Sequence, residues 1–448
     1  MASNTVYHRL PSADAAFLHM DRPTNLMVIN FVMLFDERVE VQRLRAVIAA
    51  RLLDRYPRFR QLVVGRRPPL RGPSFVEDSD FQLHHHVHHR ELPAPGDDTV
   101  LRELVSDLVT SPLKRSRPLW AMHLLDRPAA GSALVVRIHH CIVDGIALAQ
   151  LMLSLTDATS DAPADAPLWQ DALVAARTSH VRASRRERVR GTLAGASANT
   201  QALAKLLFTL PDSKTALRGR LGAHKRVAWT ERLDLALVKA TARAQGASVN
   251  DVLLAAVCGA LRRHMLECGG EPRAIRTLVP FNLRPLEEPI PRDLGNRFGL
   301  VFLTLPVDVE GRRERLQELK RRMGAIKSSR EGPVSYAILK AMGLTAPRVE
   351  SRIVDIFTAK ASAMTTNVPG PRERVYMAGT RLGAVLVWAP VSGSVGMTVS
   401  IFSYHDGVTI GLLADAGLVP EPQAIARYAE EELTELAGLA PQSLTTAA

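Results

Sequence analysis

Apolar and polar positions along the chain follow either the two-residue period of strands or the three- and four-residue spacing of helices. The expected strands are Met27–Phe35, Arg60–Val64, Trp120–Leu125, Ala133–Ile138, Arg226–Leu233, Ile275–Val279, Phe298–Leu305, Ser362–Val368, Gly383–Trp388, Gly396–Ser403 and Val408–Ala414. The expected helices are Val41–Leu53, Thr99–Thr110, Gly145–Leu155, Asp234–Gln245, Val252–Leu266, Gly311–Ser329, Val334–Met342 and Pro420–Leu436. Because strands and helices are mixed in both halves, the predicted fold class is α/β with two sheet-and-helix domains.

The length of the chain, 448 residues, exceeds what one hydrophobic core usually serves. Residues 157–167 are rich in Asp, Ala, Pro and Thr and show no periodicity, which is typical of a domain end. We therefore predict an N-terminal domain of residues 1–170, a basic helical linker of residues 171–225 and a C-terminal domain of residues 226–448. The arginines of the linker fit either an amphipathic helix on anionic lipid or a solvated interdomain helix; they are Arg177, Arg182, Arg185, Arg186, Arg188 and Arg190.

The seven residues His139–Gly145 (HHCIVDG) concentrate the chemically active side chains. They join an expected strand to an expected helix, and such a turn holds side chains rigidly where they can reach a cleft. Because side chains alternate along a strand, His140 falls on the side of Leu134 and Val136, while His139 falls on the other side. We therefore expect His140 to emerge on an apolar face, where an imidazole stays neutral.

The pattern H-H-x-x-x-D-G resembles the motif of acyl-CoA-dependent acyltransferases built like chloramphenicol acetyltransferase, and it is shared with peptide-synthetase condensation domains. Further stretches are similar to the bacterial wax ester synthase/diacylglycerol acyltransferases and stand in the order of that family: Leu10–Leu18, Pro118–Trp120, Ser248–Val252, Gly295–Arg297, Thr366–Pro371 and Ser403–Tyr404. The resemblance implies two chloramphenicol acetyltransferase-like domains with the active site in a tunnel between them. It also implies transfer of a long-chain fatty acyl group from acyl-CoA to diacylglycerol and/or a fatty alcohol, giving triacylglycerol and/or wax esters.

Acyl transfer from a thioester to an alcohol needs a base for the hydroxyl proton, a stabiliser for the tetrahedral oxyanion and exclusion of water. A neutral histidine suits the first task, which we assign to His140, with His139 in a supporting role. Asn250 stands at the start of an expected helix. There it either merely caps the helix or, at the positive end, faces the active site as a candidate oxyanion donor. Both interpretations of Asn250 stay open.

The remaining residues of the motif have structural or rival chemical interpretations. Asp144 could orient His140, but the resemblance implies that it points away and pairs with an arginine, for which Arg297 is a guess. Gly145 would permit close backbone approach or an otherwise forbidden dihedral. Cys141 raises a covalent acyl-cysteine route, but strand alternation points it away from His140, so direct transfer in a ternary complex is preferred.

The charge of +12 favours anionic partners, which we take to be an anionic membrane surface or lipid inclusion and the phosphates of acyl-CoA. The helix at Gly311–Ser329 is a second basic candidate for such contacts. No zinc-finger or RNA-binding signature is present, so no nucleic acid partner is expected. Five histidines in Phe81–Arg90 invite a metal, but strand alternation makes them diverge and no acidic or cysteine ligands accompany them. We therefore expect no metal. We also expect no cofactor, because acyl-CoA takes part as a substrate.

The compartment follows from cysteines and hydropathy. Three cysteines give no paired framework, which suits a reducing cytosol. The first twenty residues lack a basic region followed by an apolar run, so no signal peptide is expected. The longest apolar stretches are too short to span a bilayer. We therefore predict a cytoplasmic protein that is peripherally associated with the inner membrane or lipid droplets.

Two rival functions remain beside the leading one. The first is an acyltransferase acting on a polyketide or carrier-bound substrate, which the lack of a fused carrier domain disfavours. The second is a non-catalytic lipid-surface binding protein with a decayed acyltransferase fold. His140, Asp144 and Gly145 are all present in the motif, which argues against decay. The preferred acceptor and acyl length depend on tunnel-lining side chains that are distant in sequence.

Overall fold

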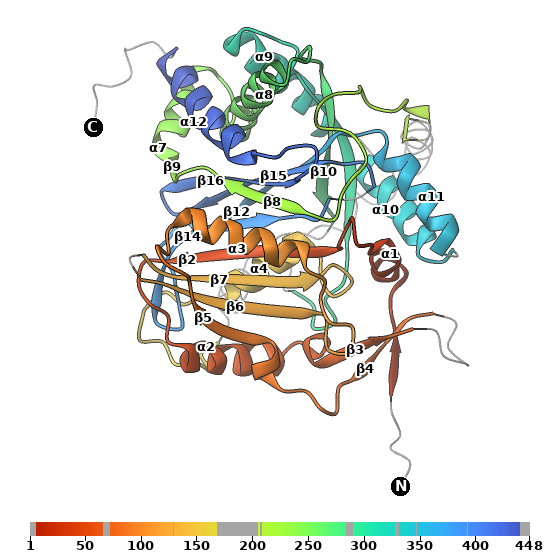
Figure 1. Cartoon of the computed structure of the whole chain (residues 1–448), viewed down its shortest axis with the longest axis vertical. Helices are drawn as coiled ribbons and strands as arrows, with labels where there is room; N and C mark the ends of the chain where they lie inside the picture. The colour runs from red at the N-terminus through yellow and green to blue at the C-terminus, as the bar shows by residue number, and fades with distance from the viewer. Residues whose placement is uncertain are drawn as a thin grey trace, which may run out of the picture.

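The structure is a computed structural model, and it describes residues 6–65, 72–128, 130–167, 205–206, 208–283, 290–327, 331–345, 347–391 and 393–439. The linker helix expected at 171–196 lies outside these residues. Figure 1 shows the described chain as two stacked halves, each with its own sheet, and places α1, α10 and α11 together at one edge.

The sheet of the N-terminal half has six strands in the order β13–β14–β2–β7–β6–β5. β2 and β7 lie in its centre and run antiparallel, with Val28 opposite His139. Three further strands form a small separate sheet in the order β1–β4–β3. The strands of both sheets are β1 (Tyr7–Arg9), β2 (Val28–Phe35), β3 (Gln61–Val64), β4 (Ser74–Glu77), β5 (Val87–Glu91), β6 (Trp120–Arg127), β7 (Gly131–His139), β13 (Tyr376–Met377) and β14 (Thr380–Trp388).

The sheet of the C-terminal half has the order β11–β10–β12–β15–β16–β8, and β9 adds to the edge of β16. Its central strands β12 and β15 are parallel, whereas β15 and β16 form the expected antiparallel hairpin. The strands are β8 (Lys225–Trp229), β9 (Leu233–Asp234), β10 (Ile275–Asn282), β11 (Phe298–Leu305), β12 (Ala363–Pro369), β15 (Met397–Tyr404) and β16 (Gly407–Asp415).

Helices cover both sheets and the edge between them. In the C-terminal half, α8 packs against α12, α9 and α7. At the edge, α1 packs against α10 and α11. The helices are α1 (Ser12–Met20), α2 (Val41–Val47), α3 (Asp98–Thr110), α4 (Gly145–Ser154), α7 (Leu235–Ala244), α8 (Val249–Glu267), α9 (Arg312–Lys327), α10 (Glu331–Met342), α11 (Pro347–Thr358) and α12 (Pro422–Gly438).

Two neighbouring strands cross between the halves. β13 and β14 come from the C-terminal part of the chain, yet they lie in the first sheet, where β14 pairs with β2 and Trp388 lies opposite Asn30. Part of the C-terminal domain expected at residues 226–448 therefore completes the sheet of the N-terminal half. The sequence could not show this, because the period of a strand says nothing about its partner.

Apolar packing holds the halves together. Each half has its own core of buried residues, and a third cluster joins residues of both sheets. In that cluster Trp388 of β14 lies beside Trp229 of β8, with ring centroids 6.1 Å apart. Burying aromatic side chains on both sides of the junction stabilises one relative placement of the sheets.

The expected elements are largely confirmed, with shifted ends. The helix expected at Val41–Leu53 ends its α-helical part at Val47 and continues as a π-helical turn. Two helices were not expected. α1 has nine residues and is mostly buried, so it shows no polar face. α11 does carry apolar residues at helical spacing, a signal that was sufficient to predict it.

Candidate active site

His140 is held at the end of β7 inside an apolar environment. Its backbone amide donates to the carbonyl of Met27 at 2.7 Å, which extends the β2–β7 pairing by one residue. The imidazole is buried and stacks on Phe17, with ring centroids 3.9 Å apart and planes 8° from parallel. Phe298 lies 5.6 Å away on another side. The expectation that His140 emerges on an apolar face is confirmed.

The amide of Asn296 fixes the tautomer of His140. The Asn296 Nδ2 atom donates to Asp14 Oδ1 at 2.8 Å and to the His140 carbonyl at 2.7 Å. Asn296 Oδ1 therefore faces His140 Nδ1, 2.8 Å away, and an amide oxygen can only accept. The proton of the neutral imidazole thus sits on Nδ1, and Nε2 keeps its lone pair. Burial lowers the pKa of His140 to about 4, against the opposing effect of Asn296.

Asp14 and Arg58 hold the hydrogen bonds between Asn296 and His140 in place. Arg58 Nη1 donates to Asp14 Oδ2 at 2.7 Å and to the carbonyl of Ile142 at 3.0 Å. Both side chains are buried. Burial raises the pKa of Asp14, and Arg58 opposes that effect. The pair ties α1 to the loop that follows His140, so the position of the imidazole depends on residues far apart in sequence.

A tight turn places Asn296 in this network. Gly295 has φ +91°, and a Cβ on it would lie 3.2 Å from Asp14 Oδ2. The Gly295 amide donates to the carbonyl of Ile142 at 3.2 Å. A side chain at Gly295 would therefore strain the backbone and press on the carboxylate that orients Asn296.

His139 points away from the cavity, as alternation predicts. Its Nδ1 accepts from the backbone amide of Cys141 at 3.1 Å, so the proton of the neutral ring lies on Nε2. That atom faces Asp21, whose Oδ2 is 3.6 Å away. Burial lowers the pKa of His139, whereas Cys141 and Asp21 raise it, to about 9. A charged ring would carry a proton on Nδ1 and could not accept the Cys141 amide, so the hydrogen bond at Nδ1 belongs to the neutral form. The contact with the Cys141 amide fits a supporting role in the turn.

Asp144 caps α4 and joins the two halves. One carboxylate oxygen accepts from the Ala147 amide at 2.8 Å and the other from the Arg297 amide at 3.2 Å. The contact with Arg297 thus goes through its backbone. Both contacts fix the loop. Asp144 does not point away from the site, however, because it is among the residues that line the cavity with His140. The pairing with an arginine side chain that the resemblance implied stays a prediction.

Gly145 does not have the forbidden dihedral that was one of its two expected roles, and that expectation is wrong. It stands at the first position of α4 with an ordinary φ, and a Cβ on it would meet no protein atom within 4 Å. Instead, Gly145 lines the cavity that contains His140. The missing side chain leaves room for a ligand.

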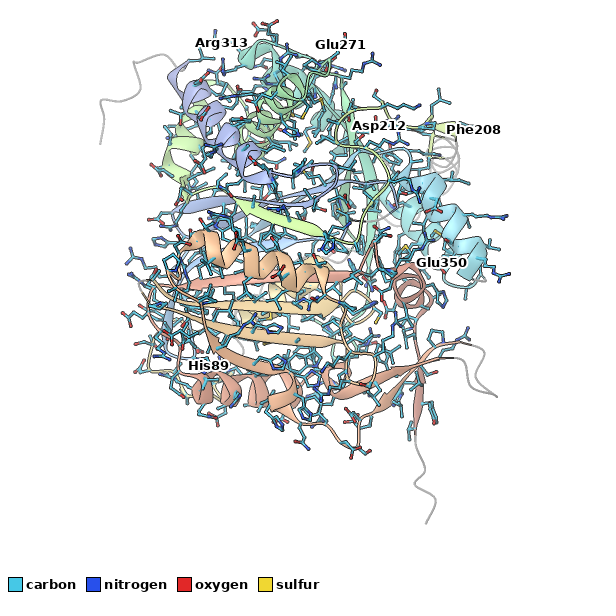
Figure 2. All side chains as sticks on the ribbon, in the orientation of Figure 1. His89, Phe208, Asp212, Glu271, Arg313 and Glu350 are labelled. Carbon is cyan, nitrogen blue, oxygen red and sulfur yellow. The ribbon has the colours of Figure 1, made fainter. Side chains whose placement is uncertain are left out.

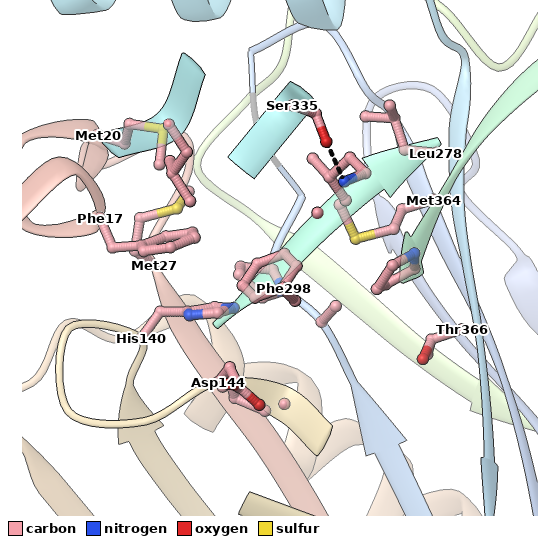
Figure 3. Close-up of a pocket in the computed structure, with 18 of the residues that line it drawn as sticks. Phe17, Met20, Met27, His140, Asp144, Leu278, Phe298, Ser335, Met364 and Thr366 are labelled. Atoms are coloured by element: carbon pink, nitrogen blue, oxygen red, sulfur yellow. Dashed lines mark hydrogen bonds between the residues drawn. The ribbon is translucent and has the colours of Figure 1, made fainter. Parts of the chain in front are cut away.

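The cavity lies between the halves, at the place the resemblance implied. About 1190 Å³ of space, part of it open to solvent, lies between the side chains that line it. Figure 3 shows the ring of His140 at its wall, with Phe17 and Phe298 next to it and Met364 on the far side. The side chains around it are predominantly apolar and come from both halves, among them Phe17, Met20, Met27, Ile29, Leu278, Phe298, Ile338, Leu339, Met342, Val354, Phe357, Met364, Val368 and Val387.

Cys141 and Asn250 are not among the residues that line this cavity. Cys141 is buried in the N-terminal core. Asn250 lies in the first turn of α8, where Ser248 and Asp251 form a capping box. Its side-chain oxygen accepts from Asn367 Nδ2 at 2.6 Å. The structure thus brings Asn250 together with the stretch Thr366–Pro371, and its role as an oxyanion donor stays a prediction.

The histidines near β5 make separate contacts. His86 donates to the Trp120 carbonyl at 2.8 Å and stacks on that indole. His89 Nε2 lies 2.7 Å from Asp126, and His88 stacks on His123. In the described ranges, no group of three or more His, Cys, Asp or Glu side chains could hold a metal ion.

The basic helix α9 is largely paired within the protein. Arg312 and Arg315 form ion pairs with Glu432 at 3.0 and 2.7 Å, and Arg321 pairs with Glu318 at 2.7 Å. These pairs favour the solvated or structural interpretation of α9 over a phosphate site.

Within the part of the chain that the structure describes, no single helix is long and apolar enough to cross a bilayer. α7 and α8 would pass that test only together, and they are bent by 97° relative to each other. α8 lies in the C-terminal core, where its apolar residues are buried.

The comparisons with known proteins agree with this architecture. The model of the wax ester synthase/diacylglycerol acyltransferase catalytic domain matches residues 10–253, and the model of the C-terminal domain of the same family matches residues 294–437. The probable diacylglycerol O-acyltransferase tgs1 of Mycobacterium tuberculosis is 27% identical and covers 98% of this chain and 98% of its own. The O-acyltransferase WSD of Acinetobacter baylyi is 25% identical over 83% of this chain and 84% of its own.

Among solved structures, the wax ester synthase/diacylglycerol acyltransferase from Marinobacter aquaeolei VT8 superimposes with a TM-score of 0.70 at 22% identity, over 96% of this chain and 100% of that one. This likeness shows the two-domain α/β fold of chloramphenicol acetyltransferase type. Together with the matches of both family models, these findings show that the chain belongs to the wax ester synthase/diacylglycerol acyltransferase family.

Proposed function

We propose that this chain transfers a long-chain fatty acyl group from acyl-CoA to the hydroxyl of diacylglycerol and/or a fatty alcohol, giving triacylglycerol and/or wax esters. One observation carries the proposal: His140 is neutral, its tautomer is set by Asn296, and it lines a predominantly apolar cavity between the halves. Apolar walls suit acyl chains, and the relatives are named for this chemistry.

His140 acts as the general base in this proposal. In the described residues its Nε2 atom has no hydrogen-bond partner, so it is available to the alcohol. The hydroxyl proton moves to Nε2 as the alcohol oxygen attacks the thioester carbonyl. The oxyanion then collapses, the carbon–sulfur bond breaks, and the imidazolium returns the proton to the leaving thiolate of CoA. Proton and charge balance over the two steps, and no covalent enzyme intermediate is needed.

Two features support this chemistry around the imidazole. The apolar walls exclude water, which would otherwise hydrolyse the thioester. The amino end of α4 reaches the cavity through Gly145 and Ile146, and a helix amino end carries partial positive charge. That end would favour a developing oxyanion, as Asn250 would if it reached the reacting atoms.

Incubation of the purified protein with palmitoyl-CoA and each acceptor in turn tests the proposal. We expect esterified product and free CoA in equal amounts with diacylglycerol, a fatty alcohol, or both. His140→Ala should lower the rate by roughly a hundred- to ten-thousandfold while circular dichroism stays unchanged. Transfer only from carrier-bound acyl groups would favour the carrier-dependent alternative. Lipid binding without any transfer would favour a non-catalytic lipid-surface protein.

We also infer that the protein associates peripherally with a membrane or lipid inclusion. The formal charge of +12 supports this, because exposed positive charge attracts an anionic leaflet. Both lipid substrates would reside in such a surface.

A further inference from the structure

The most exposed large hydrophobic side chains of the described chain gather at one edge of the molecule. Among such side chains the four highest exposed fractions belong to Phe208 (82%), Leu210 (77%), Leu344 (68%) and Ile356 (63%). Val349 is 51% exposed. We call these five residues the α11 patch. Exposed apolar groups gathered in one region of a soluble surface usually mark a site of interaction.

Hydrogen bonds attach the segment with Phe208 and Leu210 to α10 and to the end of α11. Lys205 forms an ion pair with Glu331, the first residue of α10. Lys360, just beyond α11, donates to the carbonyl of Leu206. The Asp212 amide donates to the carbonyl of Ala359 at 3.0 Å. Figure 2 shows Phe208, Asp212 and Glu350 at the same edge of the molecule.

The apolar stripe of α11 is wider than its contact with the rest of the protein. On the covered side, Val354 and Phe357 line the cavity that contains His140. Val349 and Ile356 continue the stripe onto the exposed side, three and four positions from exposed Arg352. Most surface helices instead present polar residues to solvent. The α11 patch is thus the outer surface of a wall whose inner surface faces the substrate cavity.

Positive charge surrounds the patch. Lys340, Arg348 and Arg352 are exposed on α10 and α11. The acidic Asp355 lies 3.7 Å from Arg22, and Glu350 is buried against His19. An amphipathic helix with uncovered apolar residues and flanking arginines is the arrangement that lies flat in the headgroup region of an anionic bilayer.

We propose that the α11 patch docks on an anionic phospholipid bilayer, with α11 lying in the headgroup layer. Lipid substrates then pass from the bilayer along α10 and α11 into the cavity behind them. The proposal rests on the proposed function only in that the bilayer supplies the apolar substrates. A bilayer fits the patch better than a second copy of the chain, because the basic residues around it would repel their counterparts in a symmetric contact.

The double variant Val349→Glu/Ile356→Glu tests the docking surface. Neither residue lines the cavity, and both are exposed, so the fold should persist. Leu237→Glu/Leu266→Glu is the matched control, because these residues are also exposed (42% and 53%) but lie on α7 and α8. Flotation with phosphatidylcholine vesicles, with and without phosphatidylglycerol, should show at least tenfold weaker binding for the α11 variant and wild-type binding for the control.

The charge contribution is measured with Arg348→Gln/Arg352→Gln. Removing two cations should weaken binding to anionic vesicles by about thirtyfold at low salt and leave binding to neutral vesicles unchanged. Wild-type flotation of both α11 variants would overturn the proposal. A wild-type dimer in light scattering that the α11 variants convert to monomer, with flotation unaffected, would assign the patch to a second copy instead.

Activity on dissolved substrates separates this proposal from the proposed function. With a medium-chain acyl-CoA and a short alcohol in detergent-free buffer, the α11 variants should react at the wild-type rate. On substrates embedded in vesicles they should be slower by the factor lost in binding. If the wild type acylates no acceptor and the α11 variants still lose flotation, the proposed function is refuted while the docking surface stands.

Discussion

Replacing Asn296 should weaken catalysis without removing any group that touches substrate. The amide of Asn296 accepts from Nδ1 of His140 at 2.8 Å and donates to Asp14 and to the His140 carbonyl. In Asn296→Ala the neutral imidazole can place its proton on either nitrogen, and only the tautomer with a bare Nε2 can accept the alcohol proton. Asn296 is therefore a positioning residue, and replacing it should lower the rate of transfer less than replacing His140 does.

The expected decrease in kcat for Asn296→Ala follows from the hydrogen bonds that are lost. Leaving a buried polar group unsatisfied costs about 1–3 kcal/mol. If this cost falls on the reactive tautomer, kcat should decrease by about fivefold to about 150-fold. The stability should also fall by about 1–3 kcal/mol, because Asp14 loses a donor, although Arg58 still pairs with that carboxylate.

A pH profile distinguishes positioning from a merely structural role. Burial lowers the pKa of His140 and Asn296 raises it, because its oxygen stabilises the imidazolium proton on Nδ1. The acid limb of kcat/KM should therefore move to lower pH in Asn296→Ala. It should move to higher pH in Asn296→Asp, where a carboxylate faces the imidazole. Tyr336→Phe is the control, because it changes a contact to the Asn296 backbone, 3.2 Å away, and keeps the amide. Wild-type rates and an unmoved limb in both Asn296 variants would refute the reasoning.

Three further outcomes follow from the same site. Because burial lowers the pKa of His140 to about 4 from 6.5, kcat/KM of the wild type should fall on the acid side near pH 4, and a limb near pH 6.5 would mean a hydrated imidazole. Cys141→Ser should keep most of the transfer activity, because the thiol is buried outside the cavity lining; loss of activity, with acyl-enzyme trapped in the wild type, would establish a covalent route. Gly145→Leu should leave the melting temperature unchanged but slow transfer of long acyl chains, because its side chain enters the cavity. The control is Gly324→Leu, at another glycine whose Cβ meets nothing within 4 Å, and equal rates of the two variants would contradict this role.

The sequence predicted the elements of the fold well where one face of each element decides its position. Strand alternation correctly separated His139 from His140, because β7 continues in register with β2 to Val28 opposite His139. It could not assign β14 to the first sheet, since both sheets bury strands of the same composition. Pairing between strands distant in the chain depends on the whole packing and leaves no local signal.

The site was predicted only as far as the motif reaches. His140, Asp144 and Gly145 lie together in the structure as they do in the sequence. Asn296 and Asp14 stand in stretches that carried the resemblance, but no spacing rule connects residues 14, 140 and 296. Their roles follow from three hydrogen bonds that exist only after the halves have packed. The sequence signal was the position of Asp14 among the apolar residues of Leu10–Leu18. A carboxylate that is buried with such neighbours needs hydrogen-bond partners, which could have indicated a network.

The crossing of β14 also indicates how substrates reach the cavity. Separating the halves would pull β14 from β2, to which it is paired over Leu382–Trp388, and each lost ladder bond would expose backbone groups. α11 is instead joined to α1 through side chains, with His19 and Glu350 2.8 Å apart. We therefore expect access by movement of α10 and α11. Glu350→Ala should speed amide hydrogen exchange in α11 and leave β14 protected, whereas Asp355→Ala, at a longer and exposed contact, should change neither. Exchange that rises in β14 together with α11 would mean that the halves themselves come apart.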